Sequence, residues 1–157
     1  MRYAGRTLAA AVVSAAATVA VAMFSAYRLT DAPARGRLPG PDPVGSIASS
    51  LALLVGLVAF YRLGRSIEAP SPRPAIVAGA VGGALAGVAG GIAQSAALAD
   101  YLTAVLAGYS VPAEFLSIAL TVYVFVATCA TAIIAAGVSC VGWHRGHRAV
   151  SRAGTPR

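Results

Sequence analysis

The residues from Ala75 to Ala99, AIVAGAVGGALAGVAGGIAQSAALA, decide the fold of this chain. Glycine recurs there at every fourth position, and two further glycines accompany the series. The six glycines are Gly79, Gly83, Gly87 and Gly91, with Gly82 and Gly90 beside them. Because successive residues lie about 100° apart around a helix, the glycines gather on one side and bulky residues such as Val81 and Leu85 on the other. The stretch predicts a helix with a bare ridge of backbone.

The glycine ridge makes physical sense in a membrane. In water each interior glycine costs a helix about 1 kcal/mol relative to alanine. In a bilayer every backbone N–H and C=O must be bonded internally, which a helix achieves, and small residues then let a second helix approach closely. The series resembles the glycine zippers of pore-forming and self-associating membrane proteins. We interpret it as a helix-packing surface, with compositional drift in a chain rich in alanine and glycine as the alternative.

The composition is that of a membrane protein. The 157 residues are 58% hydrophobic and 11% charged, against about 25% charged residues in soluble domains, and the mean hydropathy is +0.77. The net charge of +7 comes from arginine alone, since the sequence contains no lysine. The arginines cluster at the ends of apolar segments, where lipid headgroups lie, and they form no basic face for nucleic acid. We expect a lipid bilayer as a partner, and no nucleic acid.

Four apolar segments are long enough to cross a bilayer, which takes about 20 residues each. They cover residues 8–29, 44–62, 75–99 and 113–143. Four prolines in residues 30–43 and three in residues 63–74 break the chain between the first three segments. We predict an all-α integral membrane protein, a single domain over residues 1–157 that folds as a bundle of four transmembrane helices with short loops.

The sequence does not decide the limits of several predicted segments. We favour a retained first span, although Ala32-Pro33-Ala34 has the small residues of a signal-peptide cleavage site. Residues 100–112 form either a short interfacial helix, which we favour, or an extension of the third span. Residues 144–157 form a basic tail, and we expect disorder from Ala149 onward.

The arginines predict how the chain is oriented. With four spans, nine arginines lie on the side of the N-terminus and three, Arg28, Arg35 and Arg37, lie on the other. The positive-inside rule then places both termini in the cytoplasm, in the cell membrane. The interfacial anchors expected on that side are Tyr61, Arg62, Trp143 and Arg145.

Small residues at four-residue spacing also occur on two other predicted spans. The second span carries Ala48, Ala52 and Gly56, and the last span carries Ala127, Thr131, Ala135 and Ser139. Each column offers the glycine ridge a close-packing partner within the same chain. We therefore expect the ridge to pack intramolecularly.

Gln94 is the one strongly hydrogen-bonding side chain of the glycine-ridged helix, and it lies on the glycine side. We expect it to bond to a neighbouring helix, with a place on a narrow polar path as the alternative. Gln94 is the candidate polar site.

Groups for catalysis or metal binding are scarce. No ionisable residue stands in the middle of a predicted span, where pumps and proton-coupled carriers keep such groups. Cys129 and Cys140 would lie about 16 Å apart along one helix, too far for a disulfide. His144 and His147 are spaced as two ligands without a third. We expect no enzyme, no metal and no cofactor.

Two functional hypotheses follow. The first is a non-enzymatic membrane protein that acts through helix packing or through association with itself, as a homo-oligomer, or with a membrane-protein partner. The alternative is a small channel or carrier for an ion or small solute. For that alternative the candidate groups are Gln94 and two carboxylates on the predicted outer side, Asp100 and Glu114.

Overall fold

The computed structural model describes residues 3–30, 43–106 and 112–153, and this described part is almost entirely helical. Its four helices are α1 (Ala4–Thr30), α2 (Pro43–Arg65), α3 (Arg73–Leu106) and α4 (Ala113–Ala153). Each contains a segment long and apolar enough to cross a membrane. The all-helical fold with four helices of membrane-spanning length is therefore confirmed. The proposed cleavage motif at residues 32–34 lies outside the described residues.

Proline sets where three of the helices begin. α2 starts at Pro43, α4 starts directly after Pro112, and α3 has Pro74 in its first turn. Proline suits these positions because its fixed φ is helical and its missing N–H would have had no partner within the helix. Residues 66–72, which include Pro70 and Pro72, turn the chain between α2 and α3.

Two predicted boundaries are wrong. Residues 100–106 do not form a separate interfacial helix, because α3 continues without a break to Leu106. The stretch contains no proline or glycine, and the Thr103 hydroxyl donates to the Ala99 carbonyl at 2.7 Å within the same helix. Likewise, residues 149–153 are helical and belong to α4. Residues 107–111 and 154–157 lie outside the described part.

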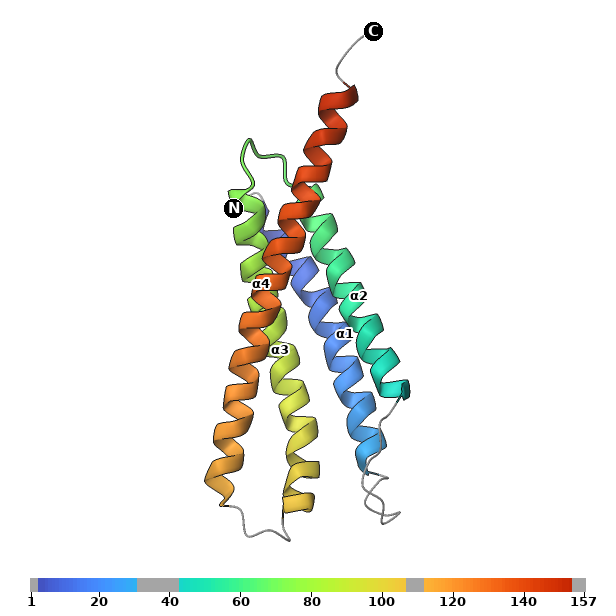
Figure 1. Cartoon of the computed structure of the whole chain (residues 1–157), viewed down its shortest axis with the longest axis vertical. Coiled ribbons are helices and arrows are strands. Elements are labelled where there is room, and N and C mark those ends of the chain that lie inside the picture. The colour runs from blue at the N-terminus through green and yellow to red at the C-terminus, as the bar shows by residue number, and fades with distance from the viewer. Residues whose placement is uncertain (1–2, 31–42, 107–111, 154–157) are drawn as a thin grey trace.

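The helices run up and down beside one another in an elongated bundle, and α4 extends past the other three at its C-terminal end (Figure 1). α3 packs against α1 and α4, and α2 packs against the same two helices. Although α2 and α3 are consecutive in the chain, they lie across a diagonal of the bundle and touch little. In the described part of the chain, α1 and α4 make no close backbone approach across the other diagonal.

The side-chain core lies at the end of the bundle that holds the turn of residues 66–72. Its large members are Phe60, Leu63, Ile67 and Trp143, all less than 8% exposed. Ser139 is fully buried among them, and its hydroxyl donates to the Phe60 carbonyl at 3.1 Å. The last turn of α2, the turn after it and the C-terminal half of α4 are thereby joined.

Candidate functional site

The six glycines of the α3 ridge are all buried. Gly79, Gly83, Gly87 and Gly91 lie against α4, and Gly90 lies against α1. Gly82 lies against both Phe60 of α2 and Thr7 of α1. On the opposite side of α3, the bulky residues are exposed, with Val77 at 60% and Ile92 at 55%. The glycine side of α3 is therefore buried, and the side that carries the large residues is exposed.

Contacts between α3 and α4 are backbone to backbone. A Cβ placed on Gly83 would lie 2.6 Å from the Thr131 carbonyl oxygen and 2.6 Å from the Ala135 Cβ. A Cβ on Gly87 would lie 2.7 Å from the Thr128 Cα. Because real Cβ atoms do not come so close, only glycine permits this approach. The column of small residues on the last span is the partner that meets these glycines.

Contacts between α3 and α1 involve threonine side chains. A Cβ on Gly90 would lie 2.6 Å from the Thr18 Cγ2. A Cβ on Gly82 would lie 3.3 Å from the Thr7 Cγ2 and 3.0 Å from the Phe60 Cε1 of α2. The expectation that the small column of the second span also receives the ridge is wrong. Its Gly56 instead faces α1, where a Cβ would lie 2.9 Å from the Ser14 Oγ. The diagonal placement of α2 and α3 explains this difference.

The sequence reading missed a second close crossing, between α2 and α4. A Cβ on Gly64 would run into the Ser139 carbonyl, and a Cβ on Gly142 would run into the Tyr61 carbonyl. A signal for this crossing was present, since Gly142 and Gly146 repeat the four-residue spacing. Gly64 was assigned to a loop because α2 was expected to end at residue 62.

The four expected interfacial anchors occupy different environments. Trp143 is only 7% exposed, and its Nε1–H donates to the Ala69 carbonyl at 3.1 Å, so its ring packs inside the bundle. Buried indole N–H groups need such an acceptor, and the turn after α2 supplies it. Tyr61 is half-buried, whereas Arg62 and Arg145 are exposed.

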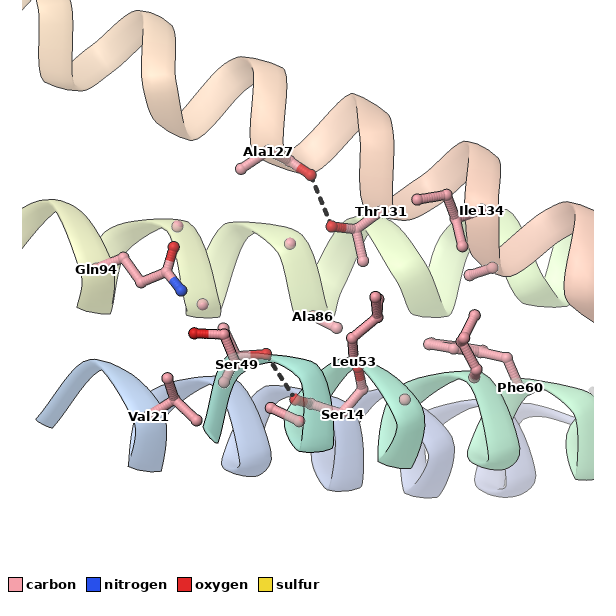
Figure 2. Close-up of a pocket in the computed structure, with 18 residues that line it drawn as sticks. Ser14, Val21, Ser49, Leu53, Phe60, Ala86, Gln94, Ala127, Thr131 and Ile134 are labelled. Carbon is pink, nitrogen blue, oxygen red and sulfur yellow. Dashed lines mark hydrogen bonds between the residues drawn. The ribbon is translucent and has the colours of Figure 1, made fainter. Parts of the chain in front are cut away.

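Gln94 joins α3 to α4 beyond the last glycine. The Tyr123 hydroxyl donates a hydrogen bond to the Gln94 Oε1. This bond leaves the amide N–H₂ group free to turn elsewhere, and in Figure 2 the Gln94 nitrogen points into the space between the helix pairs. The side chain is half-buried. Gln94 thus both bonds across helices and borders an internal space.

That space is a cavity of about 230 Å³ at the centre of the bundle, lined by all four helices (Figure 2). Its lining is mostly apolar, with five polar side chains. These are Ser14, Thr18, Ser49, Gln94 and Thr131. The cavity lies between α1 and α4, the two helices that do not approach each other.

Most of the hydroxyl groups that line the cavity donate a hydrogen bond to a carbonyl of their own helix. Thr18 donates to the Ser14 carbonyl at 3.0 Å, Thr131 to the Ala127 carbonyl at 2.7 Å, and Ser49 to the Gly45 carbonyl at 2.9 Å. Such bonds within a helix leave hydroxyl lone pairs as acceptors. The lining therefore suits a small, uncharged guest with a polar group, and it offers no charge to an ion.

Groups that would support catalysis are not gathered here. Within the described ranges, no three His, Cys, Asp or Glu side chains come close enough to hold a metal ion. His144 and His147 lie against the Trp143 ring, with centroid distances of 4.9 and 4.3 Å. Cys129 is exposed and Cys140 is half-buried, both as free thiols. Glu114 is exposed at the start of α4, and the Asp100 side chain is not among those described.

Comparison with protein-family models gave no match, and comparisons with curated proteins and with solved structures gave no significant match.

Proposed function

We propose that this chain is a non-enzymatic multi-pass protein of the cell membrane, with both termini in the cytoplasm, that acts by associating with a second copy or with another membrane protein. The six glycines of α3 serve packing inside the chain as a two-sided glycine zipper, since all of them are buried. They are therefore not the surface that a partner contacts. A partner therefore contacts a different surface, and α4 has an exposed one.

The observation that carries this proposal is Gly137. It lies in the middle of α4, it is exposed, and a Cβ placed on it would meet nothing within 4 Å. An interior glycine weakens a helix, and here no packing within the chain compensates for that cost. Close approach by a helix from outside the chain does compensate for it.

The residues around Gly137 form a continuous exposed face. Val126, Ala130 and Ile133 precede it at intervals of four, three and four residues, which places all four on one side of α4. Val126 is 57% exposed and Ile133 is 73% exposed. Bulky side chains flanking a small one provide the ridge and groove that helix association in membranes requires.

Replacing Gly137 with isoleucine tests this proposal. We expect Gly137→Ile to reduce self-association, or co-purification of a membrane partner, when the distribution of assemblies is measured by cross-linking in lipid bilayers. Gly5→Ile is the matched control, because Gly5 is also exposed with nothing within 4 Å of a Cβ. Unchanged assembly in the Gly137 variant, or equal loss in both variants, would show that this face of α4 is not an interface.

A second candidate function is a small channel or carrier, and the central cavity beside Gln94 favours it. Its lining of hydroxyl and amide groups suits a small neutral solute better than an ion. Glycerol flux in proteoliposomes tests this function, with Gln94→Leu as the variant and Ser50→Leu, an exposed position outside the cavity, as the control. Flux equal to that of protein-free liposomes would remove the candidate.

A further inference from the structure

A groove of about 600 Å³ runs along the outer surface between α1 and α2. Its walls are apolar over most of their length, and two arginines and a serine stand at one end. The lining residues are Arg6, Ala9, Ala10 and Val13 of α1, Leu54, Val55, Val58, Ala59, Arg62 and Leu63 of α2, and Ser66 after α2. The groove therefore has a charged end, and the rest of its length, its apolar body, is lined by apolar side chains.

The charged end is preorganised by the fold. One guanidinium nitrogen of Arg6 donates to the Ser66 carbonyl at 2.8 Å, which holds Arg6 across the gap between the two helices. A guanidinium carries five N–H donors, so four remain for another acceptor. Arg62 is exposed and lines the same groove. Two guanidinium groups therefore line the groove, and its lining residues include no carboxylate.

The apolar body has the length of one bilayer leaflet. From Arg62 to Leu54 the groove follows α2 for eight residues, a rise of about 12 Å. Half of the hydrocarbon core of a bilayer is about 15 Å thick. Val13, Leu54 and Val58 are between 45% and 58% exposed along this length, so the walls of the groove are open to contact from outside the chain.

We propose that this groove binds an anionic phospholipid, with the phosphate between Arg6 and Arg62 and one acyl chain along the apolar body. The charges are complementary, since arginine is well suited to phosphate and two arginines neutralise one phosphodiester with a net positive charge remaining. The apolar length matches an acyl chain that starts at the headgroup level. A soluble anion would contact only the charged end and would leave the apolar body of the groove uncovered.

Native mass spectrometry of the full-length chain, released intact from detergent, tests the proposal. The probes are palmitoyl-oleoyl phosphatidylglycerol, the corresponding phosphatidylcholine, and glycerol phosphate as the soluble headgroup. A basic residue near a membrane surface adds about fivefold to the binding of anionic lipid. We therefore expect the double variant Arg6→Gln, Arg62→Gln to bind phosphatidylglycerol about thirtyfold more weakly, with little change for phosphatidylcholine.

Two matched controls separate this site from general attraction. Arg73→Gln with Arg148→Gln removes the same charge from exposed arginines outside the groove and should leave binding unchanged. Ala9→Phe fills the groove and should weaken lipid binding. Ala20→Phe changes the same face of α1 about 16 Å further along the helix and should not weaken it.

Four results would overturn the proposal. One is equal binding of phosphatidylglycerol and phosphatidylcholine, and another is equal loss of binding in the two double-arginine variants. The third is glycerol phosphate binding as tightly as the lipid, which would show an anion site without a chain-binding groove. A change of oligomeric state in Ala9→Phe, with lipid binding intact, would equally contradict it by assigning the groove to a second copy of the chain.

Discussion

Ser139 is the residue at which three helices meet. Its hydroxyl donates to the Phe60 carbonyl of α2, its side chain lies against Gly79 of α3, and its own carbonyl lies against Gly64. The four-residue spacing places Ser139 in the small column of the last span, but it does not show that the hydroxyl bonds to another helix, since other serines bond within their own helix. Its role depends on which helices neighbour α4, and that is a property of the whole bundle.

We expect Ser139→Ala to lower the free energy of unfolding by about 1 kcal/mol, because an interhelical hydrogen bond of this kind in a membrane is worth about that much. The measurement is unfolding of the reconstituted protein in bicelles. Ser50→Ala is the control, since the Ser50 hydroxyl bonds within α2, to the Ser46 carbonyl. Equal effects of the two substitutions would show that the bond to Phe60 contributes nothing specific.

A second prediction concerns the glycines. Gly83→Ala should destabilise the bundle by about 2 kcal/mol, because the added methyl group meets the backbone of α4 at 2.6 Å and forces the helices apart. Gly137→Ala should be neutral or slightly stabilising, since its methyl group meets nothing within 4 Å and alanine favours the helix. The same unfolding measurement compares the two, and similar losses in both would contradict the close contact at Gly83.

At the scale of the helices, α3 and α4 are joined by two kinds of contact, glycine packing and a hydrogen bond between side chains. Gly79 lies against Ser139 at one end, and Gln94 accepts a hydrogen bond from Tyr123 at the other. Only the glycine contacts require close approach of the backbones. The polar contact joins α3 to α4 three residues beyond Gly91.

We expect a double-mutant cycle with Gln94→Leu and Tyr123→Phe to give a coupling free energy of about 0.6 kcal/mol, the average for such bonds in membrane proteins. The quantity measured is the free energy of unfolding of the four variants. A coupling of zero would mean that the two side chains do not bond in the bilayer. Gln94→Leu paired with the exposed Phe125→Leu supplies a cycle expected to show no coupling.

The sequence was sufficient to predict four helices long and apolar enough to cross a membrane. Its four-residue spacing also marks a small face on α3 and on α4. It was insufficient wherever the answer depended on helix order around the bundle. Gly56 was expected to face α3 and instead faces Ser14, since four-residue spacing shows that a helix has a small face but not which neighbour it meets. Trp143 is predicted as an interfacial anchor because tryptophan favours headgroups, and this residue preference does not show that its N–H donates to the Ala69 carbonyl.

At the scale of the whole molecule, the side chains of the bundle are packed unevenly along its length. Buried large side chains such as Phe60, Ile67 and Trp143 cluster at the end with the turn of residues 66–72. Further along the helices, the centre holds a cavity bordered by Gln94 and Val21. The large buried side chains therefore lie at the end of the bundle that contains Arg62 and Arg65.

The orientation of the bundle is a prediction from nine arginines against three. In a background with Cys129→Ala and Cys140→Ala, we expect Ala34→Cys to react with a membrane-impermeant maleimide in intact cells. Thr155→Cys should react only after the membrane is permeabilised, because the positive-inside rule keeps that end in the cytoplasm. Mass shifts on gels report the labelling, and the reverse pattern would mean that the chain inserts with its termini outside.

The diagonal placement of α2 and α3 has a consequence for biogenesis. As the chain is synthesised from its N-terminus, α3 enters the membrane when α1 and α2 are its only neighbours, and its contact with α2 is slight. Gly83 and Gly87 have no helix to meet until α4 emerges, so the side of α3 that requires the closest contact is solvated by lipid while translation continues. A nascent chain that stops before residue 113 would thus leave the glycine face of α3 without its partner helix, and completion of α4 is the step that covers this face.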